Sequence, residues 1–318
     1  MNKKFEIKET RKNNLKTIRL INHQSGEYIS IVPDYGANVN EMVLEKKGKL
    51  YSIIKGYRTK EEFDNHDRFY NAPLFPFAGR LPEGIYHFDG KSYQFDINDR
   101  QLNAALHGFL YNQPMKLESE IIKKHKAAIT FVFNTEKFTD SYPFSLKISI
   151  KYTLSEKGFT SQTTIENQGD RKAPAAYGVH PYFRFDKKVD ELKMMIPTEK
   201  ETVLNKQLVP LGEIKANSEF IMPGKIRGRV FDNGFQFPRQ ERIMNTELTD
   251  ETENCTINIW QETGSHKFNF LLIYTPPDRE SIAIEPLSGN INSLNSGDDL
   301  MILNPGQSAT LSWGVYLK

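Results

Sequence analysis

Alternation between apolar and polar residues constrains the fold of this chain more than any other feature. It is clear in residues 15–22 (LKTIRLIN), 27–32 (EYISIV) and 309–317 (ATLSWGVYL). Successive side chains of a strand point to opposite faces of a sheet, so this period is typical of half-buried strands. Helical signals are scarce. The exception is 59–66, where Thr59 could cap a helix and Glu62 could reciprocate from the third position. The pattern predicts an all-β protein whose first two strands are 15–22 and 27–32.

Turn residues predict how the strands pair. Asp89-Gly90 separates two aromatic-rich runs and suits a tight hairpin, whose central residues need positive φ. Three consecutive antiparallel strands are expected at 127–134, 145–154 and 158–167, joined by short polar connections, and later strands at 255–261, 267–275, 281–286 and 309–317. No linker or composition shift divides the chain. We therefore expect a single domain over residues 1–318, folded as one large antiparallel β-sandwich.

Composition excludes several classes of function. The net charge of +2 gives no electrostatic basis for binding nucleic acid. A single cysteine, Cys255, rules out an intrachain disulfide and a Cys-rich zinc site. The charged start has no signal-peptide core, and no apolar run approaches the roughly 20 residues of a membrane helix. A cytoplasmic protein without a membrane partner is expected. Its 21 Phe and 14 Tyr would suit stacking on sugars.

Two polar residues occupy strands that packing alone does not explain. In 281–285 (SIAIE), Ile282 and Ile284 share one face, so Glu285 projects from the other face beside a small alanine. A solvated glutamate at a strand end is an equally good reading of this stretch alone. In 177–185 (YGVHPYFRF), the even-numbered positions share one face and suggest the floor of a wet pocket; they are Gly178, His180, Tyr182 and Arg184. Pro181 cannot donate to a ladder, so this strand lies at an edge or ends there.

Three further polar residues are candidates for binding. Arg80 lies in an apolar, proline-flanked segment (NAPLFPFAGRL), which argues for a fixed guanidinium fork that donates to oxygens. His107 ends an apolar run and precedes Gly108. Asp232 stands between aromatic residues before Asn-Gly, where turn chemistry is the simpler explanation.

These residues resemble motifs of the aldose 1-epimerase (galactose mutarotase) family, in the family's order and over nearly the whole chain. The similar stretches are IVPDYGANVNEMVL, NAPLFPFAGRL, LHGF, GVHPYFRF, FDNGF, IAIEPLSG and LNPGQSATLSWGVYL. The chain departs from the family at Phe109, where a second glycine is common. A phosphate-using branch also has Phe there, often followed by Ala-Arg, whereas this chain continues with Leu110 and Tyr111.

The resemblance implies a galactose mutarotase-like supersandwich with an open sugar-binding groove. Glu285 would be the general base and His180 the general acid. Arg80, His107 and Asp232 would bind sugar oxygens, with Asn71 beside Arg80. Tyr182 joins them as a binding residue because it shares the face of His180. Opening and closing the ring to exchange α and β anomers needs proton transfers at two oxygens, but no metal or cofactor.

A free aldohexose is the expected substrate, since Tyr111 could stack on or hydrogen-bond a neutral sugar where the branch often has arginine. Arg184 could still reach a phosphate. A hexose-6-phosphate mutarotase and a carbohydrate-binding relative without turnover therefore remain as alternatives. Retention of both Glu285 and His180 favours an enzyme, because a binding protein does not need a matched acid and base. Oligomeric state cannot be read from the sequence.

Overall fold

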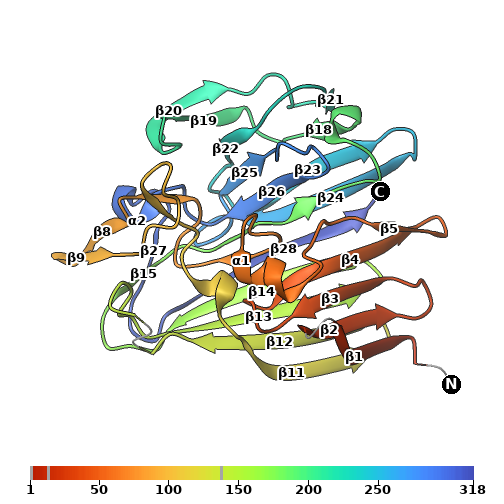
Figure 1. Ribbon diagram of the computed structural model, residues 1–318, viewed down its shortest axis with the longest axis horizontal. Coiled ribbons are helices and arrows are strands. Elements are labelled where there is room, and N and C mark those ends of the chain that lie inside the picture. Colours follow the sequence, from red (N-terminus) through yellow and green to blue (C-terminus); the bar gives the residue numbers. More distant parts are fainter. Residues whose placement is uncertain (1–2, 13–14, 137–138) are drawn as a thin grey trace.

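The computed structural model describes residues 3–12, 15–136 and 139–318, so residues 137–138 of the predicted connection 135–144 lie outside it. Strands dominate these residues (Figure 1). A five-stranded sheet follows chain order and consists of β1 (Phe5–Lys12), β2 (Leu15–Asn22), β3 (Tyr28–Val32), β4 (Asn38–Lys46) and β5 (Lys49–Ser52).

Two larger sheets follow. The nine-stranded sheet has the order β11 (Lys116–Lys123), β12 (Lys126–Asn134), β13 (Leu146–Ser155), β14 (Gly158–Asn167), β28 (Ser308–Leu317), β24 (Cys255–Thr263), β23 (Arg242–Asp250), β18 (Lys193–Met195) and β21 (Gly224–Lys225). The eight-stranded sheet has the order β20 (Pro210–Ala216), β19 (Lys200–Leu204), β22 (Asp232–Gln236), β25 (Phe270–Tyr274), β26 (Ile282–Leu287), β16 (Gly178–Val179) and β6 (Pro73–Leu74), and β17 (Tyr182–Phe183) also pairs with β26.

The remaining elements are short. Three two-strand ladders join β7 (Arg80–Pro82) to β10 (Ala104–Leu106), β8 (Ile85–Phe88) to β9 (Lys91–Gln94), and β15 (Ala173–Ala175) to β27 (Met301–Leu303). The helices are α1 (Lys60–Asn65) and α2 (Ser293–Ser296), with 3₁₀ turns at Leu110–Asn112 and Val189–Glu191. None of the helices in the described residues is long and apolar enough to cross a membrane.

The sheets pack face to face, as the alternation predicted. Strands β1 and β2 contact β11–β13, and one apolar core holds side chains from all three large sheets. Leu20 belongs to the five-stranded sheet, Ile148 and Ile257 to the nine-stranded sheet, and Ile273 and Ile284 to the eight-stranded sheet. All five are fully buried. The predicted all-β class and antiparallel sandwich are confirmed.

The local predictions are confirmed at the Asp89-Gly90 hairpin and at the start of α1, whereas the one for the start of the chain is wrong. The Asp89-Gly90 hairpin forms with positive φ at both residues, and β12, β13 and β14 pair antiparallel in sequence. Thr59 caps α1 by accepting from the Glu62 amide. The prediction that the chain opens with 15–22 was wrong, because β1 precedes it and pairs along its length with β2. The many charged residues of β1 mask the apolar alternation of a strand, although its Phe5 is buried in the core.

Candidate active site

Six of the seven predicted site residues line one cavity of about 220 Å³ on the eight-stranded sheet. They come from five separate segments of the chain: Arg80, His107, His180 with Tyr182, Asp232, and Glu285. Asn71 is the seventh and does not line it. The cavity is therefore built by sheet topology rather than by one continuous motif.

The His180 segment is interrupted at the point where the cavity begins. The strand predicted over 177–185 is split into β16 and β17, and His180 and Pro181 lie between them. Both short strands pair with β26, Gly178 opposite Leu287 and Tyr182 opposite Ala283. Pro181 has no amide hydrogen to give to a ladder, which accounts for the break. The His180 amide instead donates to the Ala72 carbonyl.

Asn71 holds this interruption in place. Its side-chain Oδ1 accepts from the Tyr182 amide at 3.1 Å, and its Nδ2 donates to the Lys55 carbonyl at 2.8 Å. Its backbone amide donates to the His180 carbonyl at 3.0 Å. The residue has a left-handed backbone, with φ of 54°. Both ends of its amide are thus engaged by the chain, and Asn71 contacts the backbone of His180 and Tyr182 without lining the cavity.

Glu285 projects from β26 into the cavity. As the alternation predicted, Ile282 and Ile284 face the main core, while Ala283 packs among tyrosines on the other face. The Glu285 side chain is fully buried, so it is not a solvated glutamate. Its Oε1 lies 3.2 Å from the Nε2 of His180. Within the described residues the carboxyl oxygens have no hydrogen-bond partner, nor does the Nδ1 of His180.

Burial shifts the pKa of Glu285 and that of His180 in the directions that favour the neutral form of each group. Burial raises the pKa of Glu285 well above its ordinary value; the Asp232 carboxylate adds to this and the Arg80 guanidinium opposes it. Burial lowers the pKa of His180 to about 3. A charge without a compensating partner is costly in an apolar environment, so burial favours the protonated carboxyl of Glu285 and the neutral imidazole of His180. The imidazole ring of His180 stacks on the Tyr182 ring with centroids 4.9 Å apart.

His107 has a defined tautomer. The Gly79 amide donates to its Nδ1 at 3.2 Å, so the ring proton is on Nε2, where the imidazole can donate to a ligand. Burial, together with His180 and Arg80, lowers the pKa of His107 well below its usual value. The residue after it must be small, because a Cβ on Gly108 would lie 2.1 Å from the Phe75 carbonyl oxygen, and φ there is +68°.

Arg80 is held by a carboxylate that the sequence did not single out. Its Nε donates to Asp99 Oδ2 at 3.0 Å, and the two side chains are 18% and 14% exposed. Asp99 in turn accepts from the Leu102 amide. The fork of Arg80 is therefore anchored at Nε, which leaves its terminal nitrogens for other partners. Asp232 begins β22 on the same cavity, and burial raises the pKa of its carboxyl, with Arg80 opposing the shift.

The three residues on which the expected choice of substrate depended do not line this cavity. Arg184 pairs with Asp186 and lines a separate surface cavity, so it does not share the pocket of His180. Phe109 is buried in the main core. Tyr111 packs edge-on against Phe69, with ring centroids 5.0 Å apart. Of the four residues predicted to share one face (Gly178, His180, Tyr182 and Arg184), only His180 and Tyr182 line this cavity, since the strand is interrupted at His180 and Pro181.

Sequence reasoning missed seven other residues of the cavity wall: Asp67, Arg68, Phe69, Gly79, Leu106, Leu272 and Tyr274. Two of them follow from pairing, since Leu272 is opposite Glu285 and Tyr274 opposite Ala283. An alternation count from Glu285 through an assumed β25–β26 hairpin could have found them. The loop 67–69 carries no such signal, because it reaches the cavity through the turn after α1.

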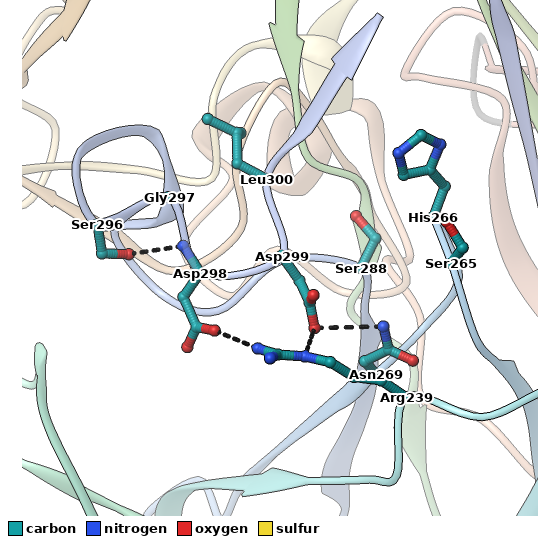
Figure 2. Close-up of a pocket in the computed structure, with 10 residues that line it drawn as sticks. All are labelled: Arg239, Ser265, His266, Asn269, Ser288, Ser296, Gly297, Asp298, Asp299 and Leu300. Carbon is teal, nitrogen blue, oxygen red and sulfur yellow. Dashed lines mark hydrogen bonds and ion pairs between the residues drawn. The ribbon is translucent and has the colours of Figure 1, made fainter.

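A larger cavity of about 540 Å³ has other walls (Figure 2). Its charged groups are engaged with one another: Arg239 donates to Asp298 and Asp299, and Asn269 donates to Asp299. This network connects the loops that carry these residues. Among the residues that the structure describes, no group of three His, Cys, Asp or Glu side chains is arranged to hold a metal ion.

Known proteins resemble this chain in sequence and in fold. Residues 16–315 match the family model described as Aldose 1-epimerase. A protein of Escherichia coli (strain K12) named YihR is 26% identical over 258 residues, 76% of this chain and 77% of that protein. The maltose epimerase of Levilactobacillus brevis is 22% identical over 330 residues, 94% of each chain. A galactose mutarotase-like protein from Clostridium acetobutylicum superimposes with a TM-score of 0.87 at 23% identity, covering 100% of this chain and 99% of that one.

Proposed function

This chain belongs to the aldose 1-epimerase family, and we propose that it interconverts the α and β anomers of a free aldohexose by acid–base ring opening and closure. The observation that carries the proposal is the buried pair of His180 and Glu285, 3.2 Å apart in a polar cavity. A structural role for such a pair would call for satisfied hydrogen bonds. Here the carboxyl oxygens and the imidazole Nδ1 have none within the described residues.

The spacing of the pair suits the reaction. The anomeric hydroxyl and the ring oxygen are bonded to the same carbon, so two catalytic atoms about 3 Å apart can each contact one of them. In the opening step, one group removes the proton of the anomeric hydroxyl and the other protonates the ring oxygen as the C1–O5 bond breaks. After rotation about C1–C2, the reverse transfers close the ring on the opposite face.

We assign the base role to Glu285 and the acid role to His180. The pair needs one proton, and moving it from Glu285 to His180 across 3.2 Å creates a carboxylate and an imidazolium without changing the net charge. Sugar hydroxyls entering the cavity would donate to the carboxylate, and Arg80 already stabilises negative charge there. Substrate binding would thus favour the ionised form that burial opposes in the empty site.

The other cavity residues would orient the sugar. His107 would donate from Nε2, Arg80 from its terminal nitrogens, and the Asp232 carboxyl would accept from a hydroxyl or donate to one. Tyr182 and Tyr274 supply flat ring surface on the same wall. Asn71 would act through its contacts with Tyr182 and His180 rather than by touching the sugar.

Polarimetry on freshly dissolved α-D-glucose and α-D-galactose tests the proposal. We expect the purified protein to accelerate the approach to the equilibrium rotation well beyond the buffer control. If no aldose shows a rate above the control while calorimetry detects sugar binding, the protein is a carbohydrate-binding relative without turnover.

A further inference from the structure

Phe69 has a backbone conformation that a bulky residue rarely adopts. Its φ is 50°, in the left-handed region, where a large side chain is an outlier. Hydrogen bonds hold it there, because the Phe69 amide donates to the His66 carbonyl at 3.2 Å and the Ala72 amide donates to the Phe69 carbonyl at 3.2 Å. Strained residues of this kind cluster at functional sites. Glycine would fit this backbone more easily, so the phenyl ring calls for an explanation.

The ring of Phe69 contacts two other aromatic side chains. Its centroid lies 4.7 Å from that of the His107 imidazole, with the planes at 62°, and 5.0 Å from that of Tyr111, with the planes at 86°. It also lines the cavity of the His180–Glu285 pair and packs against the apolar cluster that contains Leu272. Phe69 is thus tied to Tyr111 and to the eight-stranded sheet, and it contacts His107 from a fixed position.

The His107 ring needs more than its hydrogen bond to be oriented. The Gly79 amide donates to Nδ1 and sets the tautomer, but one hydrogen bond at 3.2 Å leaves the ring free to tilt about that contact. Ring contacts limit the tilt, since Phe69 lies 4.7 Å away and His180 lies 5.1 Å away between centroids. A donor weakens steeply when it is misaligned with its acceptor. The direction of the Nε2–H of His107 therefore depends on its aromatic neighbours.

Phe69 also limits the access of water to His107. The imidazole is buried whereas the phenyl ring in contact with it is partly exposed, so the phenyl ring covers part of the imidazole. Burial lowers the pKa of His107 well below its usual value, and His180 and Arg80 add to this shift. The other ionisable groups of the cavity wall are those of Asp67, Arg68, Tyr182, Asp232, Tyr274 and Glu285. Phe69 carries no charge, so it acts on His107 through shape and through exclusion of water.

We propose that Phe69 is a positioning residue, which holds the His107 imidazole with its Nε2–H directed into the cavity, toward the sugar. The left-handed backbone sets the direction in which the ring leaves the loop after α1. The kinetic part of this inference rests on the proposed function. The orientation and protonation of His107 do not depend on turnover, so they can be tested by themselves.

The test uses imidazole nitrogen chemical shifts, measured by NMR on labelled protein, which report both the tautomer and the titration of His107. The His107 signals are those lost in His107→Gln. We expect Phe69→Ala to raise the pKa of His107 toward the ordinary value of about 6.5, because water reaches the ring, and to mix the two tautomers. Phe69→Tyr keeps the ring and should preserve the wild-type signals. Phe88→Ala truncates a partly buried phenylalanine that does not line the cavity, and it is the matched control.

Kinetics should show weaker binding with the chemistry largely kept. We expect Phe69→Ala to raise KM for α-D-glucose or α-D-galactose about tenfold, as expected for a misplaced donor. The change in kcat should be smaller, because the His180–Glu285 pair is untouched. Phe69→Tyr and Phe88→Ala should both stay within about twofold of the wild-type KM.

Unchanged His107 shifts and titration in Phe69→Ala would overturn the proposal, and so would an equal change in Phe88→Ala or Phe69→Tyr. A lower melting temperature of Phe69→Ala with wild-type KM and wild-type His107 signals would mean that the ring is purely structural. The expected NMR changes in a protein whose wild type shows no mutarotation would support the positioning of His107 and count against the proposed function only.

Discussion

The Nε2 of His180 and the Oε1 of Glu285 lie 3.2 Å apart, and their side chains are 6% and 0% exposed. Two ionisable groups at this distance and depth titrate as one unit rather than independently. The expected activity, its pH dependence and the pH dependence of stability all depend on this pair.

Removing either member of the pair should abolish most activity. We expect Glu285→Gln and His180→Asn each to lower kcat for mutarotation by about 10²–10⁴, the usual range for acid–base assistance. The double variant should lose little more than the worse single variant, because the two groups act together. Polarimetry measures the rates, with Glu120→Gln and His125→Asn on the exposed β11–β12 surface as controls. Wild-type rates in either site variant would show that the catalytic assignment is wrong.

The pH profile of kcat/KM should be bell-shaped, with its limbs moved apart by burial. From unperturbed values one would assign the acid limb to protonation of Glu285 and the alkaline limb to deprotonation of His180. Burial reverses this assignment, because the pKa of His180 falls to about 3 and that of Glu285 rises well above its ordinary value. Activity should therefore persist below the ordinary glutamate pKa of about 4.3 and decline only as the pH falls toward about 3. An acid limb centred at about pH 4.3, with chemistry rate-limiting, would contradict this prediction.

The same shifts predict opposite pH slopes of stability. His180 is neutral in the folded protein but takes up a proton below about pH 6.5 when unfolded, so its contribution is lost as pH falls toward about 3. The pKa of Glu285 is raised in the folded protein, whereas in the unfolded chain this carboxyl ionises above about pH 4.3, so its contribution is lost as pH rises. Relative to wild type, His180→Asn should gain stability on acidification, by at most about 1.4 kcal/mol per pH unit. Urea unfolding at several pH values measures this, and parallel curves would rule it out.

Asp99 should affect substrate binding although it does not line the cavity. Asp99→Asn would turn an amide toward the Nε of Arg80 and loosen the guanidinium, so we expect KM to rise about tenfold, in line with one charged hydrogen bond. The effect on kcat should be smaller, because the His180–Glu285 pair stays intact. Asp96→Asn, at an exposed position three residues earlier, is the matched control. A lower melting temperature with unchanged KM would mean that the ion pair is purely structural.

A sugar without phosphate should be preferred over its 6-phosphate. The cavity that holds Arg68 and Arg80 also holds Asp67 and Asp232, whose carboxyl groups would oppose a dianion. Arg184, which could have bound a phosphate, lines a different surface cavity. Steady-state kcat/KM for glucose and glucose 6-phosphate decides the question. A preference of about tenfold for the phosphate, or 1.4 kcal/mol, would refute the expectation.

Periodicity predicted the strands and most of the site because both depend on local rules. The position of Glu285 on the face opposite Ile282 and Ile284 follows from alternation alone. The structure around His180 cannot be predicted from alternation alone. Pro181 shows that the strand ladder must break, but the sequence does not indicate which segment hydrogen-bonds the chain at the break. That segment proved to include Asn71, more than 100 residues earlier, with its amide facing the chain rather than the cavity.

Contacts between distant segments explain the remaining misses. Asp99 lies in the loop between β9 and β10 and accepts a hydrogen bond from Arg80. No pattern in the sequence of this loop indicates a partner for a guanidinium. Loop 67–69 enters the cavity after α1 ends at Asn65, where the C-cap residue His66 has a left-handed conformation. Such placements depend on how whole elements pack, and a one-dimensional pattern does not contain that information.

The strands next to His180 and the strand that carries Glu285 are hydrogen-bonded to each other, since β16 and β17 flank His180 and both pair with β26. His180 and Glu285 therefore belong to one cooperative folding unit in the interior of the eight-stranded sheet. Separating them would mean opening the sheet itself. Thermal inactivation should accordingly coincide with global unfolding, and the amides of β26 should be among the slowest in the protein to exchange with deuterium.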